Sequence, residues 1–276
     1  MFTDYHVHTA FSDDSVYPLP QVIQDAIAMG MEEICLTDHV DYGIKVDPDS
    51  GQEIPRWNGY LLANTDYPRY EAAIQESRRQ YGHRIRIKMG LEFGMQLHTI
   101  PQFEALFRRY PFDFVLLSIH QIENRVFWNQ DFQQGKTQRE AHLRYYEEML
   151  ELVRRYKNYS VLGHVDHLVR YDREGPCPFE TISPLLTEIF RQVIADGKGI
   201  ELNTSYRRYG LPDSTPARPI LELYRDLGGR ILTLGSDSHK PEHLGTYIRE
   251  GRELLKSLGF REFCTFEKME PTFHPL

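Results

Sequence analysis

Histidine and acidic residues gather in short clusters along this chain. The clusters are His6-Val7-His8, Asp13-Asp14, Thr37-Asp38-His39, Gly90-Leu91-Glu92, Ser118-Ile119-His120, Gly163-His164 and Gly235-Ser236-Asp237-Ser238-His239. Imidazole and carboxylate groups without thiolates suit Zn, Mn or Fe. These side chains exceed the needs of one ion, and a carboxylate such as Glu92 can bridge two ions. The sequence therefore predicts a cluster of divalent ions rather than a single site.

The alternative is that these are ordinary structural residues, because a lone histidine at the end of a strand is more often hydrogen-bonded than metal-bound. Burying so many unpaired acids and imidazoles together would, however, cost several kcal/mol without compensating ions. The metal interpretation is therefore favoured. Asp38 is expected to orient His39 or another ligand through a hydrogen bond. His167 lies three residues beyond His164 and can face the pocket, but we interpret it as structural.

Short apolar or β-branched runs alternate with longer helical patterns, which indicates βα units around a parallel sheet. We predict strands at residues 2–6, 33–37, 85–90, 112–119, 161–164, 199–203 and 230–235. We predict helices at residues 19–29, 67–81, 100–109, 138–156, 181–196, 217–227 and 241–258. About seven such units would close into a barrel one unit short of the eight-fold type. The clusters then lie at the C-terminal ends of strands, where alternate residues such as His6 and His8 can reach one ion.

Residues 40–64 fall outside this alternation and are expected to form a long loop after the second strand. The segment contains the turn-forming residues Pro48, Gly51, Pro55 and Gly59. Long loops at that end of a barrel usually shape the substrate pocket. Tyr42, Trp57 and Trp128 could line the pocket, although aromatic residues in such loops pack at least as often as they bind. We interpret residues 1–276 as a single barrel domain with this pocket-shaping loop.

The composition narrows the class of protein. The 276 residues include 40 acidic and 32 basic side chains, for a net charge of −8, whereas a nucleic-acid-binding protein usually has a basic face. The mean hydropathy of −0.51 and the lack of a long apolar run argue against a membrane-spanning helix. Cys35, Cys177 and Cys264 form no Cys-x-x-Cys pair. The first residues lack a signal-peptide pattern, so we expect a cytoplasmic protein that binds neither nucleic acid nor a membrane.

Taken in order, the clusters resemble the motifs of the PHP (polymerase and histidinol phosphatase) superfamily. The resemblance runs from Asp4 to Phe260 and is specific as a set. Within the superfamily the chain is most similar to the histidinol-phosphatases, as indicated by Phe11-Ser12, Asp14-Ser15, Gly163-His164-Val165-Asp166, Arg170-Tyr171 and Glu201-Leu202-Asn203-Thr204-Ser205. The resemblance implies an α/β fold of the distorted (β/α)7 barrel type, with its metal site at the C-terminal ends of the strands.

The resemblance also implies three divalent metal ions (Zn, Mn or Fe) and their ligands. The first ion would be held by His6, His8, Glu92 and Asp237. Glu92 would bridge to a second ion, whose other ligands are His120 and His164. The third ion would be held by Asp14, His39 and His239. Asp14 is preferred to Asp13 because its distance from the His-x-His pair matches the family ligand, although many superfamily members have a histidine there.

The reaction implied by the resemblance is hydrolysis of the phosphate monoester L-histidinol phosphate to L-histidinol and phosphate, a step of histidine biosynthesis. Arg170 and Arg207 match the approximate positions of phosphate-binding arginines, although the sequence does not distinguish Arg207 from Arg208. We expect Arg170 to neutralise phosphoryl oxygens during in-line attack by water. Asp237 is the expected catalytic residue, because it can orient the water and shuttle its proton.

Three alternatives stay open at this point. Another PHP phosphoesterase would act on a nucleotide, a sugar phosphate or a phosphodiester, and an assay on a diester would identify it. An amidohydrolase barrel also begins with His-x-His, but it should have eight units and a lysine near the middle strand, where this chain has Glu92 and His120. A metal-storage or metal-sensing protein would not explain the pocket loop or the arginines. The sequence does not identify the residues that recognise histidinol, the general acid, the native metals or the oligomeric state.

Overall fold

A parallel sheet forms the centre of the computed structural model, which describes residues 1–276 apart from the side chain of Tyr60. Its strands follow the order β1 (Thr3–Val7), β2 (Glu33–Leu36), β6 (Arg86–Gly94), β7 (Phe114–Ser118), β10 (Val161–Leu162), β11 (Gly199–Asn203) and β12 (Leu232–Gly235). The segment after β12 returns to β1, where the His8 amide donates to the Ser238 carbonyl (2.8 Å) and the Ser238 amide donates to the His6 carbonyl (3.2 Å). The predicted distorted (β/α)7 barrel is confirmed.

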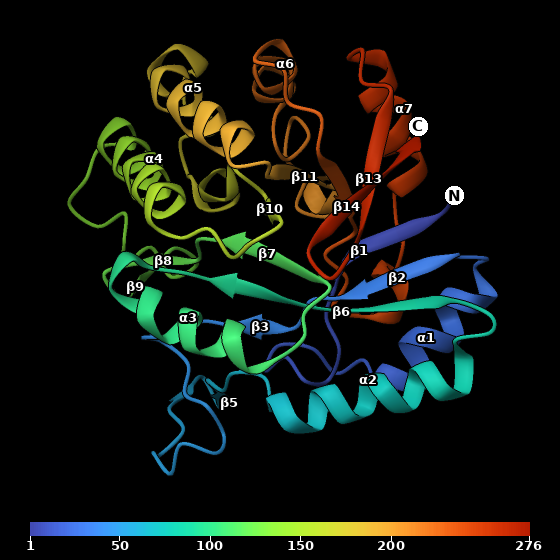
Figure 1. Ribbon diagram of the computed structural model, residues 1–276. Helices are drawn as coiled ribbons and strands as arrows, with labels where there is room; N and C mark the ends of the chain where they lie inside the picture. Colours follow the sequence, from blue (N-terminus) through green and yellow to red (C-terminus); the bar gives the residue numbers. More distant parts are fainter.

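Helices surround the sheet (Figure 1). They are α1 (Leu19–Ala28), α2 (Tyr67–Tyr81), α3 (Ile100–Arg109), α4 (Gln138–Arg155), α5 (Phe179–Ala195), α6 (Arg218–Asp226) and α7 (Ile248–Ser257). The sequence sets their limits locally. The Thr137 hydroxyl accepts from the Glu140 amide at the start of α4, and the Glu140 carboxylate accepts from the Thr137 amide. In α5 the apolar spacing buries Ile189 and Val193.

Two elements differ from their expected limits by more than two residues. The helix predicted at residues 241–258 is a short 3-10 turn, η4 (Pro241–His243), followed by α7, because Gly245 and Tyr247 between them adopt left-handed φ values of 65° and 61°. Strand β6 continues to Gly94 instead of ending at residue 90. A short strand, β3 (His39–Val40), follows β2 in the chain and pairs with this second half of β6.

A C-terminal hairpin, β13 (Glu262–Glu267) and β14 (Glu270–Pro275), was not predicted. It lies beside β1, near both chain ends (Figure 1). Cys264 and Phe266 of β13 pack against Tyr5 and Phe114, and the Phe266 amide donates to the Tyr5 hydroxyl at 2.6 Å. Phe114 begins β7, so the hairpin fills the end of the barrel opposite the carboxyl ends of the strands.

Residues 40–64 are mostly irregular, as expected, but they contain a small hairpin of β4 (Arg56–Trp57) and β5 (Tyr60–Leu61). The base of this loop is fixed by hydrogen bonds. The Asp41 amide donates to Asn64 Oδ1, and Asn64 Nδ2 donates to Asp47 Oδ1, both at 2.8 Å. A second hairpin, β8 (Gln121–Ile122) and β9 (Arg125–Val126), precedes α4. Within the part of the chain that the structure describes, no helix is long and apolar enough to cross a membrane.

Candidate metal centre

All nine predicted metal ligands lie together at the carboxyl ends of the strands. They come from β1 and the loop after it (His6, His8, Asp14), β3 (His39), β6 (Glu92), the ends of β7 and β10 (His120, His164) and the segment after β12 (Asp237, His239). Seven of them line a cavity of about 160 Å³, and His6 and His8 are completely buried. Parallel strands bring their ends to one edge, so residues far apart in sequence meet here.

Glu92 stands at the centre of this cluster, with its two carboxylate oxygens facing different histidines. Glu92 Oε2 lies 3.2 Å from His6 Nε2 and 3.5 Å from His8 Nε2. Glu92 Oε1 lies 3.1 Å from His120 Nε2 and 2.8 Å from His164 Nε2. A carboxylate with this arrangement is suited to bridge two cations.

Asp237 completes the group around Glu92 Oε2. Its Oδ1 atom is 3.7 Å from His6 Nε2 and 3.6 Å from His8 Nε2. The residue follows β12 with a left-handed φ of 55°, which directs the chain back toward β1. His6, His8 and Asp237 are close enough for one cation to contact all three.

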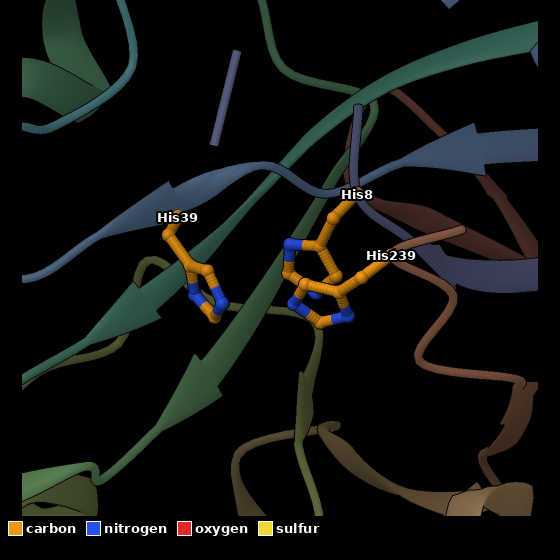
Figure 2. Close-up of side chains that lie close together, drawn as sticks. All are labelled: His8, His39 and His239. Carbon is orange, nitrogen blue, oxygen red and sulfur yellow. The ribbon is translucent and has the colours of Figure 1, made fainter. Parts of the chain in front are cut away.

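A third group lies nearer to solvent. Figure 2 shows the His8, His39 and His239 side chains turned toward one another, and the His8 ring stacks on the His39 and His239 rings at centroid distances of 4.2 and 4.0 Å. Asp14 Oδ2 is 3.5 Å from His39 Nε2 and 3.3 Å from His239 Nε2. Asp13, the alternative weighed from the sequence, instead pairs with Lys45 at 2.7 Å.

Five buried atoms of the predicted ligands have no hydrogen-bond partner. One is His164 Nδ1, and the other four lie close together: His6 Nε2, His8 Nε2, His39 Nδ1 and Glu92 Oε2. Buried polar groups are normally paired, because an unpaired one costs about 1–3 kcal/mol. The four atoms converge on one point, since each of the three nitrogens is within 3.5 Å of Glu92 Oε2. Divalent cations bound among these side chains would satisfy them, so the donor set fits a metal centre.

The charges of the cluster favour a cation as well. Burial raises the pKa of Glu92, but His6, His120 and His39 outweigh burial and hold that pKa well below its usual range. Burial lowers the pKa of His120, yet Glu92 and Asp41 raise it to about 9. The site therefore attracts positive charge, which divalent ions would supply in place of protons.

Hydrogen bonds from outside the cluster fix the orientation of its histidines. Glu201 Oε1 is 2.7 Å from His6 Nδ1, and Asp41 Oδ1 is 2.7 Å from His120 Nδ1. With Nδ1 engaged in this way, Nε2 of each ring is left for a cation. The sequence analysis did not assign these two acids a role. Position was the only signal that the sequence offered for them: Glu201 is in β11, and Asp41 follows β3 by one residue.

Asp38 acts on a histidine through Ser12. Ser12 Oγ donates to Asp38 Oδ1 at 2.7 Å and lies 3.2 Å from His8 Nδ1. Asp38 also accepts from the amide and the hydroxyl of Thr9, at 2.7 and 2.9 Å, which holds the loop after β1 in place. The hydrogen bond expected from Asp38 thus reaches His8 rather than the imidazole of His39.

The arginines expected to bind phosphate are placed differently from each other. Arg170, in the 3-10 helix η2 (His167–Tyr171), lines the cavity, donates to Asp237 Oδ2 at 3.1 Å and lies over the Tyr209 ring at 3.9 Å. Arg207 is not among the lining residues, and its guanidinium lies 4.9 Å from the Tyr247 ring centroid. Its neighbour Arg208 donates to the Asp237 carbonyl at 2.8 Å and so supports the turn after β12. The structure therefore brings Arg170 to the site and does not bring Arg207 there.

Two further cavity residues extend the site. Lys45 Nζ lies 3.0 Å from Asp41 Oδ2, so the base of the 40–64 loop is tied to the acid that orients His120. His167 faces the cavity and its ring is 4.2 Å from that of His164. Lys45 carries no sequence signal beyond its place in the loop.

Comparisons with known proteins show the family and the fold. The family model described as the PHP domain matches residues 4–205. A histidinol-phosphatase from Lactococcus lactis is 32% identical over 274 residues, which cover 97% of this chain and 95% of that protein. A crystal structure of histidinol phosphate phosphatase from Lactococcus lactis, complexed with zinc, L-histidinol and phosphate, has a TM-score of 0.83 at 30% identity and covers 98% of each chain. A structure from Listeria monocytogenes, at 18% identity and a TM-score of 0.74, covers 89% of this chain and 98% of its own and shares the fold.

Proposed function

This chain belongs to the PHP domain family, and from that membership we propose that it is a metal-dependent phosphomonoester hydrolase. It converts L-histidinol phosphate and water into L-histidinol and phosphate, a step of histidine biosynthesis, and so works in the cytoplasm. One observation carries the proposal. Glu92 lies between two sets of buried imidazoles in a chain that is 30% identical to a phosphatase whose structure contains zinc, L-histidinol and phosphate.

The site uses divalent metal ions. We assign three of them, drawn from Zn, Mn and Fe, to the ligand sets described above. His6, His8, Glu92 and Asp237 form the first set, Glu92, His120 and His164 the second, and Asp14, His39 and His239 the third. When bound, such ions polarise phosphoryl oxygens and lower the pKa of water, which makes water a nucleophile near neutral pH.

Arg170 is the residue that binds the phosphoryl group. Its guanidinium lines the cavity and is held by Asp237 and by Ser205 Oγ, which it reaches at 2.9 Å. Phosphate has a geometry that a guanidinium matches with two parallel hydrogen bonds. Because Tyr209 supports the guanidinium plane from one side, Arg170 is oriented before substrate arrives.

Asp237 is the catalytic residue. Burial raises its pKa, but His6 and Arg170 outweigh burial and hold the pKa of Asp237 well below its usual range, so the carboxyl is ionised. Asp237 Oδ1 faces His6 and His8, and Asp237 Oδ2 accepts from Arg170. An ionised carboxylate between the histidines and the phosphate-binding arginine can accept a hydrogen bond from the attacking water, orient it toward phosphorus and shuttle its proton away without retaining it.

Substitution of Glu92 and His120 tests the proposal. Glu92→Gln and His120→Asn should reduce phosphate release from L-histidinol phosphate by more than about 100-fold and lower the bound metal content, because each removes a ligand from the centre. The exposed Glu267→Gln is a matched control on β13 and should retain full activity. Folded Glu92→Gln protein with activity near that of the wild type would contradict the proposal.

A further inference from the structure

The cavity has two chemically different parts. The metal ligands and Arg170 account for the phosphoryl group, and with Asp41, Lys45, Gln121 and His167 they form most of the polar lining. The remaining lining includes four apolar side chains, Ile44, Leu62, Val126 and Trp128. These four side chains have no role in the chemistry at phosphorus. We therefore expect them to contact the organic half of the substrate.

A pair of tryptophans joins this apolar lining to the 40–64 loop. Trp57 lies on β4 and Trp128 follows β9 by two residues, yet their ring centroids are 4.0 Å apart, with the rings inclined at 68°. Trp57 is 41% exposed and Trp128 is 36% exposed, and Leu61 of the same hairpin is 41% exposed. Exposed apolar surface concentrated beside a cavity is typical of a ligand-binding site.

The loop that carries Trp57 is fixed relative to the metal centre. At its base Lys45 Nζ contacts Asp13 Oδ1 at 2.7 Å and Asp41 Oδ2 at 3.0 Å, and Asp41 in turn contacts His120. At its tip Trp57 contacts Trp128. The apolar lining is thus held at a set distance from the point where phosphorus must lie.

We propose that Trp128 binds the organic half of the substrate and thereby determines specificity, and that Trp57 positions Trp128. The proposal rests on the function assigned above. L-Histidinol phosphate carries an imidazole ring and an ammonium group, and both are favourable on an indole face through stacking and cation–π attraction. A sugar phosphate or another hydroxyl-rich monoester has neither an aromatic ring nor a cation. The apolar lining with Trp128 therefore selects an aromatic, cationic leaving group.

Kinetics of Trp128 variants test the proposal with inorganic phosphate as an internal reference. Trp128→Leu keeps apolar volume but removes the π-face, so KM for L-histidinol phosphate should rise about tenfold while kcat stays within about twofold. The inhibition constant of inorganic phosphate should not change, because phosphate binds at the metal centre and Arg170. Trp128→Phe keeps an aromatic face and should recover most of the lost affinity.

The role of Trp57 is tested by comparing KM for L-histidinol phosphate with the inhibition constant of phosphate, because a general structural defect would change both. Trp57→Ala should raise KM for L-histidinol phosphate several-fold without changing the inhibition constant of phosphate, and Trp57→Phe should restore KM. Phe273→Leu is the matched control, because Phe273 is an aromatic residue on β14 that is 39% exposed. It should leave every constant unchanged.

Fluorescence gives a second measurement that needs no turnover. Trp57 and Trp128 are the only tryptophans in the sequence. L-Histidinol added to the metal-loaded protein should change the emission, and inorganic phosphate alone should not. Wild-type protein that fails to hydrolyse L-histidinol phosphate would overturn the proposed function and this inference with it. Efficient turnover with an unchanged KM in Trp128→Leu, or with equal losses for L-histidinol phosphate and inorganic phosphate, would overturn the inference alone.

Discussion

Gly94 gives the sharpest structural prediction, because a single methyl group there would separate Asp41 from His120. A Cβ atom at residue 94 would lie 1.8 Å from Asp41 Oδ1 and 2.7 Å from His120 Nδ1. Non-bonded atoms do not approach so closely, so the carboxylate must move by more than about 1 Å. The hydrogen bond between Asp41 and His120, now 2.7 Å, would be lost. Gly94 is in β6, where alanine has no backbone penalty, so the effect falls on this contact.

The expected loss of metal affinity follows from the role of the hydrogen bond between Asp41 and His120. Losing the group that orients a metal-binding histidine typically lowers metal affinity by about 10–100-fold. Gly94→Ala should therefore weaken metal binding by that factor, measured by competition with a chromophoric chelator, and reduce phosphatase activity at limiting metal. Excess metal should restore much of the activity, because the ligands themselves remain.

A double-mutant comparison shows whether the effect passes through Asp41. Asp41→Ala removes the same hydrogen bond, so adding Gly94→Ala to it should cost less than about twofold further. Circular dichroism would confirm that each variant is folded. Wild-type metal affinity in folded Gly94→Ala protein, or full additivity of the two changes, would contradict this role of the Asp41–His120 hydrogen bond.

Further predictions concern the arginines and the pH dependence of stability. Arg170→Ala should raise KM for L-histidinol phosphate and the inhibition constant of phosphate by roughly 10–100-fold, since it removes charge-assisted hydrogen bonds to the phosphoryl group. Arg207→Ala should change both constants by less than about twofold in the same steady-state assay, and a loss equal to that of Arg170→Ala would restore Arg207 to the site. Burial outweighs Asp172 and lowers the pKa of His142. His142 therefore binds fewer protons in the folded protein than in the unfolded chain, so its contribution to the free energy of unfolding should fall as the pH drops through about 6.5. Urea unfolding of wild type and His142→Gln should show a weaker decline in the variant, and parallel curves would contradict the assignment.

The sequence predicted the barrel and the meeting of the clusters because both follow from short-range patterns. Apolar runs define parallel strands, and the residue after a strand lies at its carboxyl end wherever the strand pairs. His39 and Glu92 could therefore be placed on one edge without knowledge of their contacts. The order of the motifs then indicated the family resemblance, and the resemblance implied the expected ligand sets.

What the sequence did not provide depends on contacts between distant segments. Asp41 and Glu201 look like ordinary acids until the fold brings them to His120 and His6. Arg207 and Arg208 are adjacent in the sequence, at the end of the 3-10 helix η3 (Thr204–Arg207). The turn of this helix directs both guanidinium groups away from the cavity that Arg170 lines. The packing of the C-terminal hairpin was not predictable either, because Cys264 and Phe266 contact Tyr5 and Phe114, which are more than a hundred residues away.

The most direct test of the account is steady-state phosphate release from L-histidinol phosphate by protein loaded with Zn or Mn. A panel of sugar and nucleotide monoesters and bis-p-nitrophenyl phosphate should be measured in parallel. The kcat/KM for L-histidinol phosphate should exceed that of every panel compound by orders of magnitude, and activity should be abolished by a chelator and return when metal is restored. Weak and uniform activity across the monoesters, preference for the diester, or turnover that survives chelation would contradict this prediction.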